Sequence, residues 1–179
     1  NEFSREYMPT VFENFFTEIT IDHKTIVKLS LWDTAGQDEY DRLRPLTYPE
    51  TDVIVICFSV DSPESLRIIP EKWYPEVKHF CPDVPIILIS NKSDLKNDQY
   101  TLDELRAQNQ APIEREEAED MARKIGAIAY LEVSALTNEG IGNLFDQAAK
   151  AALAATDVHD VQKGSQCFLR TPPTCTALL

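Results

Sequence analysis

Two long apolar runs place the strongest constraint on how this chain can fold. The first spans Val53–Val60 and the second spans Pro85–Ser90, and neither alternates between apolar and polar residues. A strand that is buried on both faces has this pattern, and such strands occur mainly in parallel sheets that helices cover. Helical patterns follow each run, so strands alternate with helices along the chain. The sequence therefore predicts an α/β fold with a mostly parallel sheet and helices on both faces.

Weaker patterns predict the remaining elements. Apolar and polar residues alternate over Thr17–Ile21, and Ile26–Trp32 is the returning strand of a predicted hairpin. A helix is expected to start with Ser62 as its cap and to be interrupted at Pro70, which has no N–H to donate. The other expected elements are an exposed loop over Asn1–Asn14, a short helix at Asp103–Arg106, a helix at Glu114–Ile125, a strand at Ala129–Val133 and a last helix through Ile141–Ala152.

Length and charge narrow the class of protein. A chain of 179 residues is long enough for one domain with a sizeable core, which we predict over residues 1–155, and the polar tail 156–179 is expected to be disordered. The net charge of −13 argues against a nucleic-acid partner, because phosphate binding needs a basic surface. The four cysteines lack the spacing of a metal site, which fits a reducing cytosol. We therefore expect a cytoplasmic protein that does not bind nucleic acid.

Polar residues that follow a predicted strand form the first candidate site. Asp33 lies at the end of the second hairpin strand, where an open α/β sheet holds its ligand, and a carboxylate at that place can hold Mg²⁺. Gly36 allows the backbone to approach a phosphate closely, and Gln37 can orient an attacking water. A strand followed by a polar turn would give the same short motif, so these residues alone do not decide the function.

Two further motifs follow later strands and should lie on the same edge of the sheet. They consist of Asn91, Lys92, Ser93 and Asp94, and of Ser134 with Ala135. The Asp94 carboxylate can accept hydrogen bonds from N1–H and the exocyclic amine of guanine, a pair that adenine does not offer. Asn91 can brace the loop, the Lys92 stem can lie along the purine face, and the Ala135 N–H can donate to guanine O6. The spacing of these motifs predicts a guanine-nucleotide site.

With these motifs in place, the chain resembles a small GTPase of the Rho family. Residues 7–14 are similar to the family's switch I, and Trp32–Gln37 with Tyr40–Leu46 are similar to its switch II. The stretch Pro75–Pro82 is typical of Rho proteins. The polar segment 96–112 matches the extra helical insert that separates Rho proteins from Ras-like and Rab-like relatives. The resemblance covers the chain from Glu6 to about Leu153.

The resemblance implies a GTP-binding, GTP-hydrolysing molecular switch with a Ras-like P-loop NTPase fold, which signals to cytoskeleton and polarity effectors. Its cofactors would be GTP or GDP and Mg²⁺. Thr10 and Asp33 would hold the metal, Tyr7 would cover the phosphates, and Gln37 would be catalytic. The implied nucleotide contacts are Tyr7, Thr10, Asp33, Gly36, Asn91, Lys92, Asp94, Ser134 and Ala135.

The same resemblance implies protein partners at both switches. Effectors would contact Val11, Phe12, Glu13 and Asn14. Exchange factors, GTPase-activating proteins or dissociation inhibitors would contact Tyr40, Arg42, Leu43 and Leu46. Ordinary packing is the alternative for the apolar members; it is favoured for Phe12 taken alone and is less favoured for the exposed pair Leu43 and Leu46.

Three features depart from the family's pattern. None of the five glycines precedes switch I, so the family's P-loop, first strand and first helix would lie before Asn1. We therefore expect an N-terminally truncated version of the fold, with an open core and poor nucleotide turnover. Leu136 stands where the family usually has lysine. The cysteine of a prenylation box would be fourth from the end, where the chain has Thr176 in place of the neighbouring Cys175.

Two functions from different classes remain open. The first is the GTP-hydrolysing switch, present as a fragment, and the second is a Rho-like interaction module that presents its switch surface without nucleotide turnover. The retained Asp33, Gln37 and Asp94 favour the switch, whereas the missing P-loop favours the module. The tail has few basic residues, which argues against a membrane anchor. A cytoplasmic location is therefore expected, with peripheral association at the inner face of the plasma membrane as the alternative.

Overall fold

The computed structural model describes residues 12–21, 25–163 and 174–178. The chain divides into two compact units, which are described separately. Of the described residues, unit 1 comprises Ile56–His79 and Ile86–Leu144, and unit 2 comprises 12–21, 25–55, Phe80–Pro85, 145–163 and 174–178.

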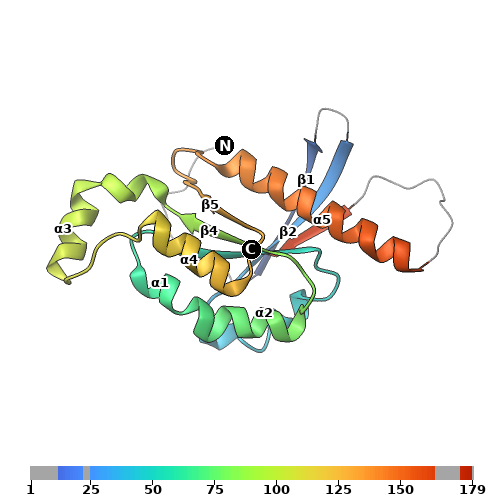
Figure 1. Ribbon diagram of the computed structural model, residues 1–179, viewed down its shortest axis with the longest axis horizontal. Helices are drawn as coiled ribbons and strands as arrows, with labels where there is room; N and C mark the ends of the chain where they lie inside the picture. The colour runs from blue at the N-terminus through green and yellow to red at the C-terminus, as the bar shows by residue number, and fades with distance from the viewer. Residues whose placement is uncertain (1–11, 22–24, 164–173, 179) are drawn as a thin grey trace. The chain divides into compact units, whose positions relative to one another are not determined.

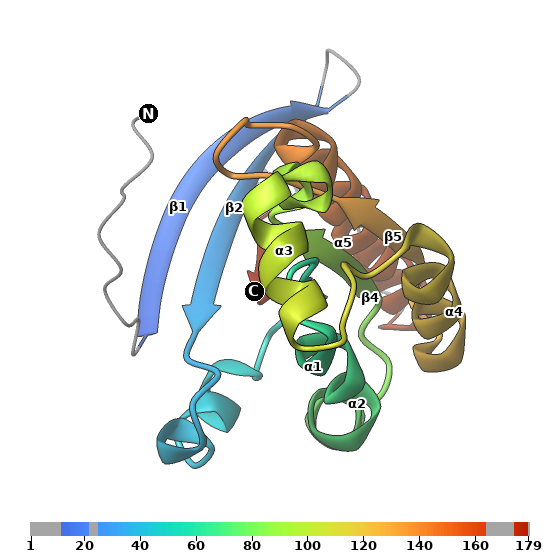
Figure 2. The ribbon, with the colours of Figure 1, turned by 90° about the vertical axis from the view of Figure 1, so that its left-hand side faces the viewer.

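Unit 2 is built on an antiparallel hairpin (Figure 2). Strand β1 spans Phe12–Ile21 and strand β2 spans Thr25–Thr34, and the two are paired along their whole length. Val27, Leu29 and Leu31 lie on one face of β2 and are buried, and Ser30 on the other face is also buried. The predicted hairpin is confirmed, although its turn at residues 22–24 lies outside the described residues. The predicted loop over Asn1–Asn14 is wrong from Phe12 onward, because those residues pair with β2.

A short parallel strand lies beside β2 in the same unit (Figure 1). This strand, β6, spans Thr174–Leu178 and pairs with Lys28–Trp32 of β2. Its last two residues also pair with Val53 and Ile54, at the start of strand β3. The strand order in this unit is therefore β1-β2-β6-β3. Although we expected an open core in the truncated fold, β2 has a parallel neighbour over Lys28–Trp32.

The expectation of a disordered tail over 156–179 is wrong for two stretches. Helix α5 spans Ile141–Lys163, and β6 follows at Thr174–Leu178. Alanine is the strongest helix former, and the alanine-rich sequence around Ala152 favours continuation of α5. β6 finds backbone partners on β2 and β3 that lie far away in the sequence, so local composition gives no sign of it. None of the helices in the described ranges has the length and apolar character needed to span a membrane.

The strands of unit 1 are the buried apolar runs. Strand β3 spans Val53–Ser59 and enters unit 1 at Ile56, strand β4 spans Ile86–Asn91, and strand β5 spans Ala129–Glu132. β4 lies between β3 and β5 and pairs with β5 in parallel. Every residue of β4 before Asn91 is buried. The predicted parallel strands with two buried faces are therefore confirmed.

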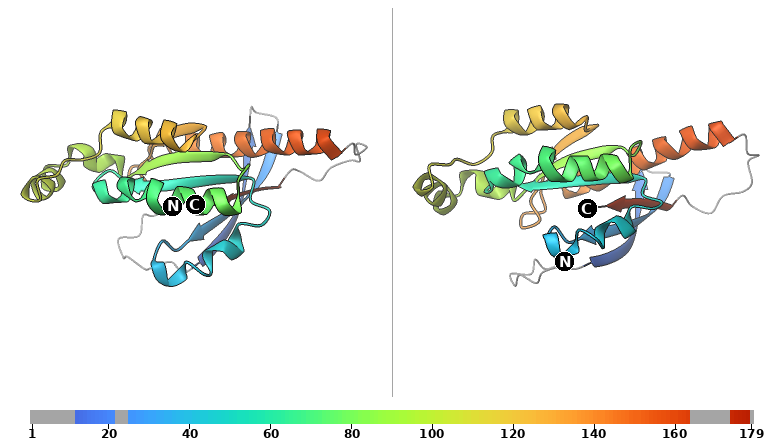
Figure 3. Two further views of the ribbon diagram at one scale, coloured as in Figure 1. Left: turned by 60° about the horizontal axis from the view of Figure 1, so that its bottom comes forward. Right: turned by 90° about the horizontal axis from the view of Figure 1, so that it is seen from below.

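A helical segment with an irregular middle follows β3 (Figure 3). Helix α1 spans Pro63–Arg67, a π-helical turn spans Ile69–Trp73, and helix α2 spans Tyr74–Phe80. The predicted interruption at Pro70 is confirmed. The predicted cap is wrong, because the Ser62 side chain makes no capping hydrogen bond. Instead the Ser65 hydroxyl donates to the Ser62 carbonyl at 2.6 Å.

Two further helices complete unit 1. Helix α3 spans Gln99–Ala107 and helix α4 spans Arg115–Ile125. α3 is longer than the predicted Asp103–Arg106 helix because the Asp98 carboxylate accepts a hydrogen bond from the Thr101 N–H at 2.8 Å and caps its N-terminus. The predicted α4 is confirmed, with a capping box at its start and Gly126 at φ 66° at its end.

Candidate functional site

The predicted base-recognition residues lie together in unit 1, at the ends of β4 and β5. Asn91 ends β4, and the next residue, Lys92, adopts a left-handed conformation with φ 58° and ψ 41°. This turn leads into a 3₁₀ helix over Ser93–Asn97, termed η4. The Ser93 N–H donates to the Val133 carbonyl at 3.0 Å. The loop after β4 is therefore tied to the residue that follows β5.

A buried serine joins the two motifs through the key carboxylate. The Ser134 hydroxyl donates to Asp94 Oδ1, and it accepts a hydrogen bond from the Thr137 N–H at 3.1 Å. Ser134 is fully buried, whereas Asp94 is half-buried and Ala135 is exposed. An ionised carboxylate has about four acceptor positions, so Asp94 keeps the capacity to accept two more hydrogen bonds after the serine has taken one. This arrangement fits the two donors on one edge of guanine.

Lys92 is held by an acid that sequence reasoning missed. Its Nζ lies 3.1 Å from Asp61 Oδ2, and the Asp61 carboxylate also accepts a hydrogen bond from the Ser59 hydroxyl. Burial raises the pKa of Asp61, but the hydrogen bonds from Ser59 and Lys92 outweigh it, so the pKa lies below its usual value. Asp61 follows the β3 strand, and Asp33 lies near the end of β2. A position at the end of a strand is the signal that could have identified Asp61.

Asp33 and its neighbours lie in unit 2. Asp33 is half-buried near the end of β2, whereas Gly36 and Gln37 are exposed. Thr10 and Tyr7, the other predicted phosphate and metal contacts, lie outside the described residues. Within the described ranges no three His, Cys, Asp or Glu side chains gather into a metal cluster. Mg²⁺ is commonly held by one or two carboxylates together with substrate phosphates, so a single Asp33 carboxylate fits that mode of binding.

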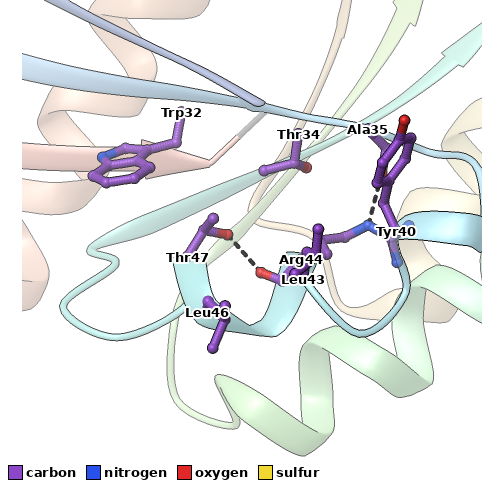
Figure 4. A pocket seen from close by; sticks show the side chains of 8 residues that line it. All are labelled: Trp32, Thr34, Ala35, Tyr40, Leu43, Arg44, Leu46 and Thr47. Carbon is purple, nitrogen blue, oxygen red and sulfur yellow. Dashed lines mark hydrogen bonds between the residues drawn. The ribbon is translucent and has the colours of Figure 1, made fainter. Parts of the chain in front are cut away.

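A buried arginine holds the loop that carries Gln37 (Figure 4). Arg44 Nε donates to the Ala35 carbonyl at 3.0 Å, and Arg44 Nη2 lies 2.9 Å from Asp41 Oδ1. Only 5% of Arg44 is exposed. The sequence predicted a functional role for Arg42, which is exposed, and none for Arg44. Composition alone does not distinguish these two arginines, which lie two residues apart.

An apolar cavity opens between β2 and the short helical turns that follow it (Figure 4). It encloses about 270 Å³, and its lining includes Trp32, Tyr40, Leu43, Leu46 and Thr47. The two turns are η1, Asp38–Tyr40, and η2, Arg44–Thr47. The predicted exposure of the leucine pair is confirmed, since 52% of Leu43 and 73% of Leu46 are exposed. Both leucines can therefore contact a partner.

The predicted effector-facing residues are described only in part. Glu13 is exposed and Asn14 is half-buried, and both lie on β1. The Asn14 side-chain oxygen accepts a hydrogen bond from the Ser30 hydroxyl at 3.2 Å. Val11 lies outside the described residues, and Phe12 is described only as part of the strand.

Comparison with known families identifies the family to which the chain belongs. The profile of the Ras family matches residues 1–154 of the 179-residue chain. The match includes the loops that carry Asp33, Gln37, Asp94 and Ser134. Ras-family proteins are small GTPases that bind guanine nucleotides, typically with Mg²⁺, and their α/β fold agrees with the parallel strands and flanking helices described above. The chain therefore belongs to the Ras family of small GTPases.

Proposed function

We propose that the protein is a GTP-binding and GTP-hydrolysing switch of the Rho type, which signals to cytoskeleton and polarity effectors. The observation that carries the proposal is the contact between Ser134 and Asp94, which fixes an acceptor carboxylate at the ends of two parallel strands. The Rho assignment is supported by segment 96–112, where α3 forms the extra helix expected of that subfamily. A cytoplasmic location, with peripheral membrane association as an alternative, is part of the same proposal.

Base selection follows from the hydrogen-bonding groups in unit 1. Asp94 accepts from N1–H and the exocyclic amine of guanine, while Ser134 keeps the carboxylate in place from behind. Adenine presents no matching pair of donors, so binding it would leave a carboxylate desolvated and unpaired. Asn91 braces the loop, the Lys92 stem covers the purine face, and the Ala135 N–H meets O6.

In this proposal, residues of unit 2 carry out GTP hydrolysis. The exposed Gln37 side chain orients a water molecule for attack on the γ-phosphorus, and the Arg44 contacts hold the neighbouring backbone. Asp33, together with Thr10, holds Mg²⁺, and Tyr7 covers the phosphates. The metal ion supplies neutralisation of the negative charge that develops between the β- and γ-phosphates.

The proposed partner surface comprises both switches. Effectors contact Val11, Phe12, Glu13 and Asn14, and regulators contact Tyr40, Arg42, Leu43 and Leu46. The exposure of Leu43 and Leu46 beside an apolar cavity supports the second set, because exposed apolar side chains around a pocket are typical of interaction sites. The same observation also favours the second candidate function, an interaction module without nucleotide turnover.

Base preference and turnover test the proposal on the full chain. Titration with GDP and with ADP should give at least about tenfold tighter binding of GDP, since a mismatched base leaves a polar group unpaired. Single-turnover measurements should show slow GTP hydrolysis, which Gln37→Leu slows further without weakening binding. Equal affinity for the two nucleotides would overturn the proposal. Guanine-selective binding with no hydrolysis above the buffer rate would favour the interaction module instead.

A further inference from the structure

A polar network in unit 1 joins the base-recognition loop to β5. Lys96, in η4, donates from Nζ to Glu132 Oε1 at 2.8 Å, and the two side chains are only 20% and 25% exposed. The Tyr130 hydroxyl donates to the same carboxylate oxygen at 3.2 Å. Glu132 therefore receives one hydrogen bond from the loop after β4 and another from its own strand.

The network continues to the residue just before the loop. Ser90 Oγ lies 3.0 Å from Tyr130 Oη, and Ser90 is completely buried. A tyrosine hydroxyl has one proton, and Tyr130 uses it on Glu132, which has none to give while ionised. Ser90 must therefore donate to Tyr130. The hydrogen bonds run in one direction, from Ser90 through Tyr130 to Glu132.

Two further contacts restrain the tyrosine. The Phe58 ring stacks with the Tyr130 ring at a centroid distance of 6.4 Å, and the Arg115 guanidinium lies 5.7 Å from the centre of the same ring. Arg115 Nη1 also lies 4.0 Å from Glu132 Oε1. Glu132 is thus flanked by two cations and a hydroxyl, and its partial burial weakens solvent screening of those interactions.

The network holds the recognition loop at both of its ends. Ser90 immediately precedes Asn91, and Lys96 follows Asp94 by two residues. We propose that Glu132 is a positioning residue for guanine recognition, which fixes both ends of residues 91–95 so that the Asp94 carboxylate meets the base at the correct place. This inference rests on the proposed function, and it assigns Glu132 no direct contact with nucleotide.

A base-specific measurement distinguishes positioning from general stabilisation. Inosine diphosphate lacks the exocyclic amine that Asp94 would accept from, so the ratio of GDP to inosine diphosphate affinity reports the placement of that carboxylate. In the full chain, Lys96→Met should lower GDP affinity about tenfold and inosine diphosphate affinity less. Lys96→Arg keeps a donor and should preserve the ratio. Lys124→Met removes an exposed lysine on α4 and is the matched control.

Amide hydrogen exchange of the nucleotide-free chain provides the second measurement. The Ser93 N–H donates to the Val133 carbonyl, and the Leu95 N–H donates to the Lys92 carbonyl. Both amides should exchange faster in Lys96→Met, while those of Ile87–Ile89 in β4 should not change. Equal losses of GDP and inosine diphosphate affinity, or unchanged exchange at Ser93 and Leu95, would overturn the proposal. If the wild-type chain bound neither nucleotide, the proposed function would fail, and the exchange measurement alone would decide whether the network fixes the loop.

Discussion

Replacement of Arg44 by methionine should destabilise unit 2 much more than the same replacement at Arg42. The two arginines lie in the same loop, but Arg44 is buried and Arg42 is exposed. Methionine keeps part of the apolar stem and removes the guanidinium group. The comparison therefore separates the loss of the buried Arg44 contacts from the general effect of removing an arginine from this loop.

The magnitude follows from the individual contacts. The Ala35 carbonyl would lose its 3.0 Å hydrogen bond inside a buried site, and an unsatisfied buried acceptor costs about 1–3 kcal/mol. Loss of the 2.9 Å ion pair with Asp41 adds up to about 1 kcal/mol, since the Asp41 side chain is 41% exposed. The contact with the Gln37 carbonyl, at 3.5 Å, is too long to add much. We expect the free energy of unfolding to fall by about 1–4 kcal/mol.

Urea denaturation followed by the fluorescence of Trp32 measures this loss. A Trp73→Phe background removes the only other tryptophan, which lies in unit 1. Arg42→Met in the same background should change the free energy of unfolding by less than about 0.5 kcal/mol, as is usual for surface substitutions. Similar losses for the two variants would refute the assigned role of Arg44.

Other predictions concern pH and the C-terminal strand. Burial raises the pKa of Tyr130 from its ordinary 10 to about 12, so stability should be full below pH 10 and should fall as the pH rises toward 12; Tyr130→Phe should remove that part of the fall in thermal melts. Burial would raise the pKa of Glu132, but the hydrogen bond and charge of Lys96 outweigh it and lower the pKa. Ionised Glu132 therefore stabilises the fold above pH 4.5, and this stabilisation is lost as the pH falls through the lowered pKa. Acid denaturation of Glu132→Gln should not show this loss of stability. Deletion of residues 174–179 should lower the melting temperature, because β2 loses its parallel neighbour; an unchanged melting temperature would contradict the role of β6.

Local patterns were sufficient to predict much of the fold. The apolar run over Ile86–Ser90 predicted a buried strand because both of its faces are covered, and Pro70 predicted the interrupted helix because it lacks an N–H. β6 could not be predicted, since its partners lie on β2 and β3 and its own sequence does not specify them. The cap formed by Asp98 did leave a signal, an acid three residues before Thr101, and it explains the greater length of α3.

The part of the candidate site that lies at the ends of strands could be predicted from the sequence. Asp94 and Ser134 are 40 residues apart, and their contact follows from the rule that parallel strands end on the same edge. Arg44 and Glu132 were missed because their roles depend on which carbonyls and hydroxyls lie around them. Those neighbours come from other parts of the chain, so no spacing in the sequence encodes them.

Reversal of base specificity at Asp94 tests the central claim most directly. In Asp94→Asn an NH₂ group replaces one of the two carboxylate oxygens, so the side chain presents a donor where guanine requires an acceptor. Titration of the full chain should show lower affinity for GDP and higher affinity for xanthosine diphosphate, whose ring carries a carbonyl in place of the exocyclic amine. Asp103→Asn, at an exposed acid on α3, should leave both affinities unchanged. Unchanged GDP affinity in Asp94→Asn would contradict the assignment of this loop as the guanine site.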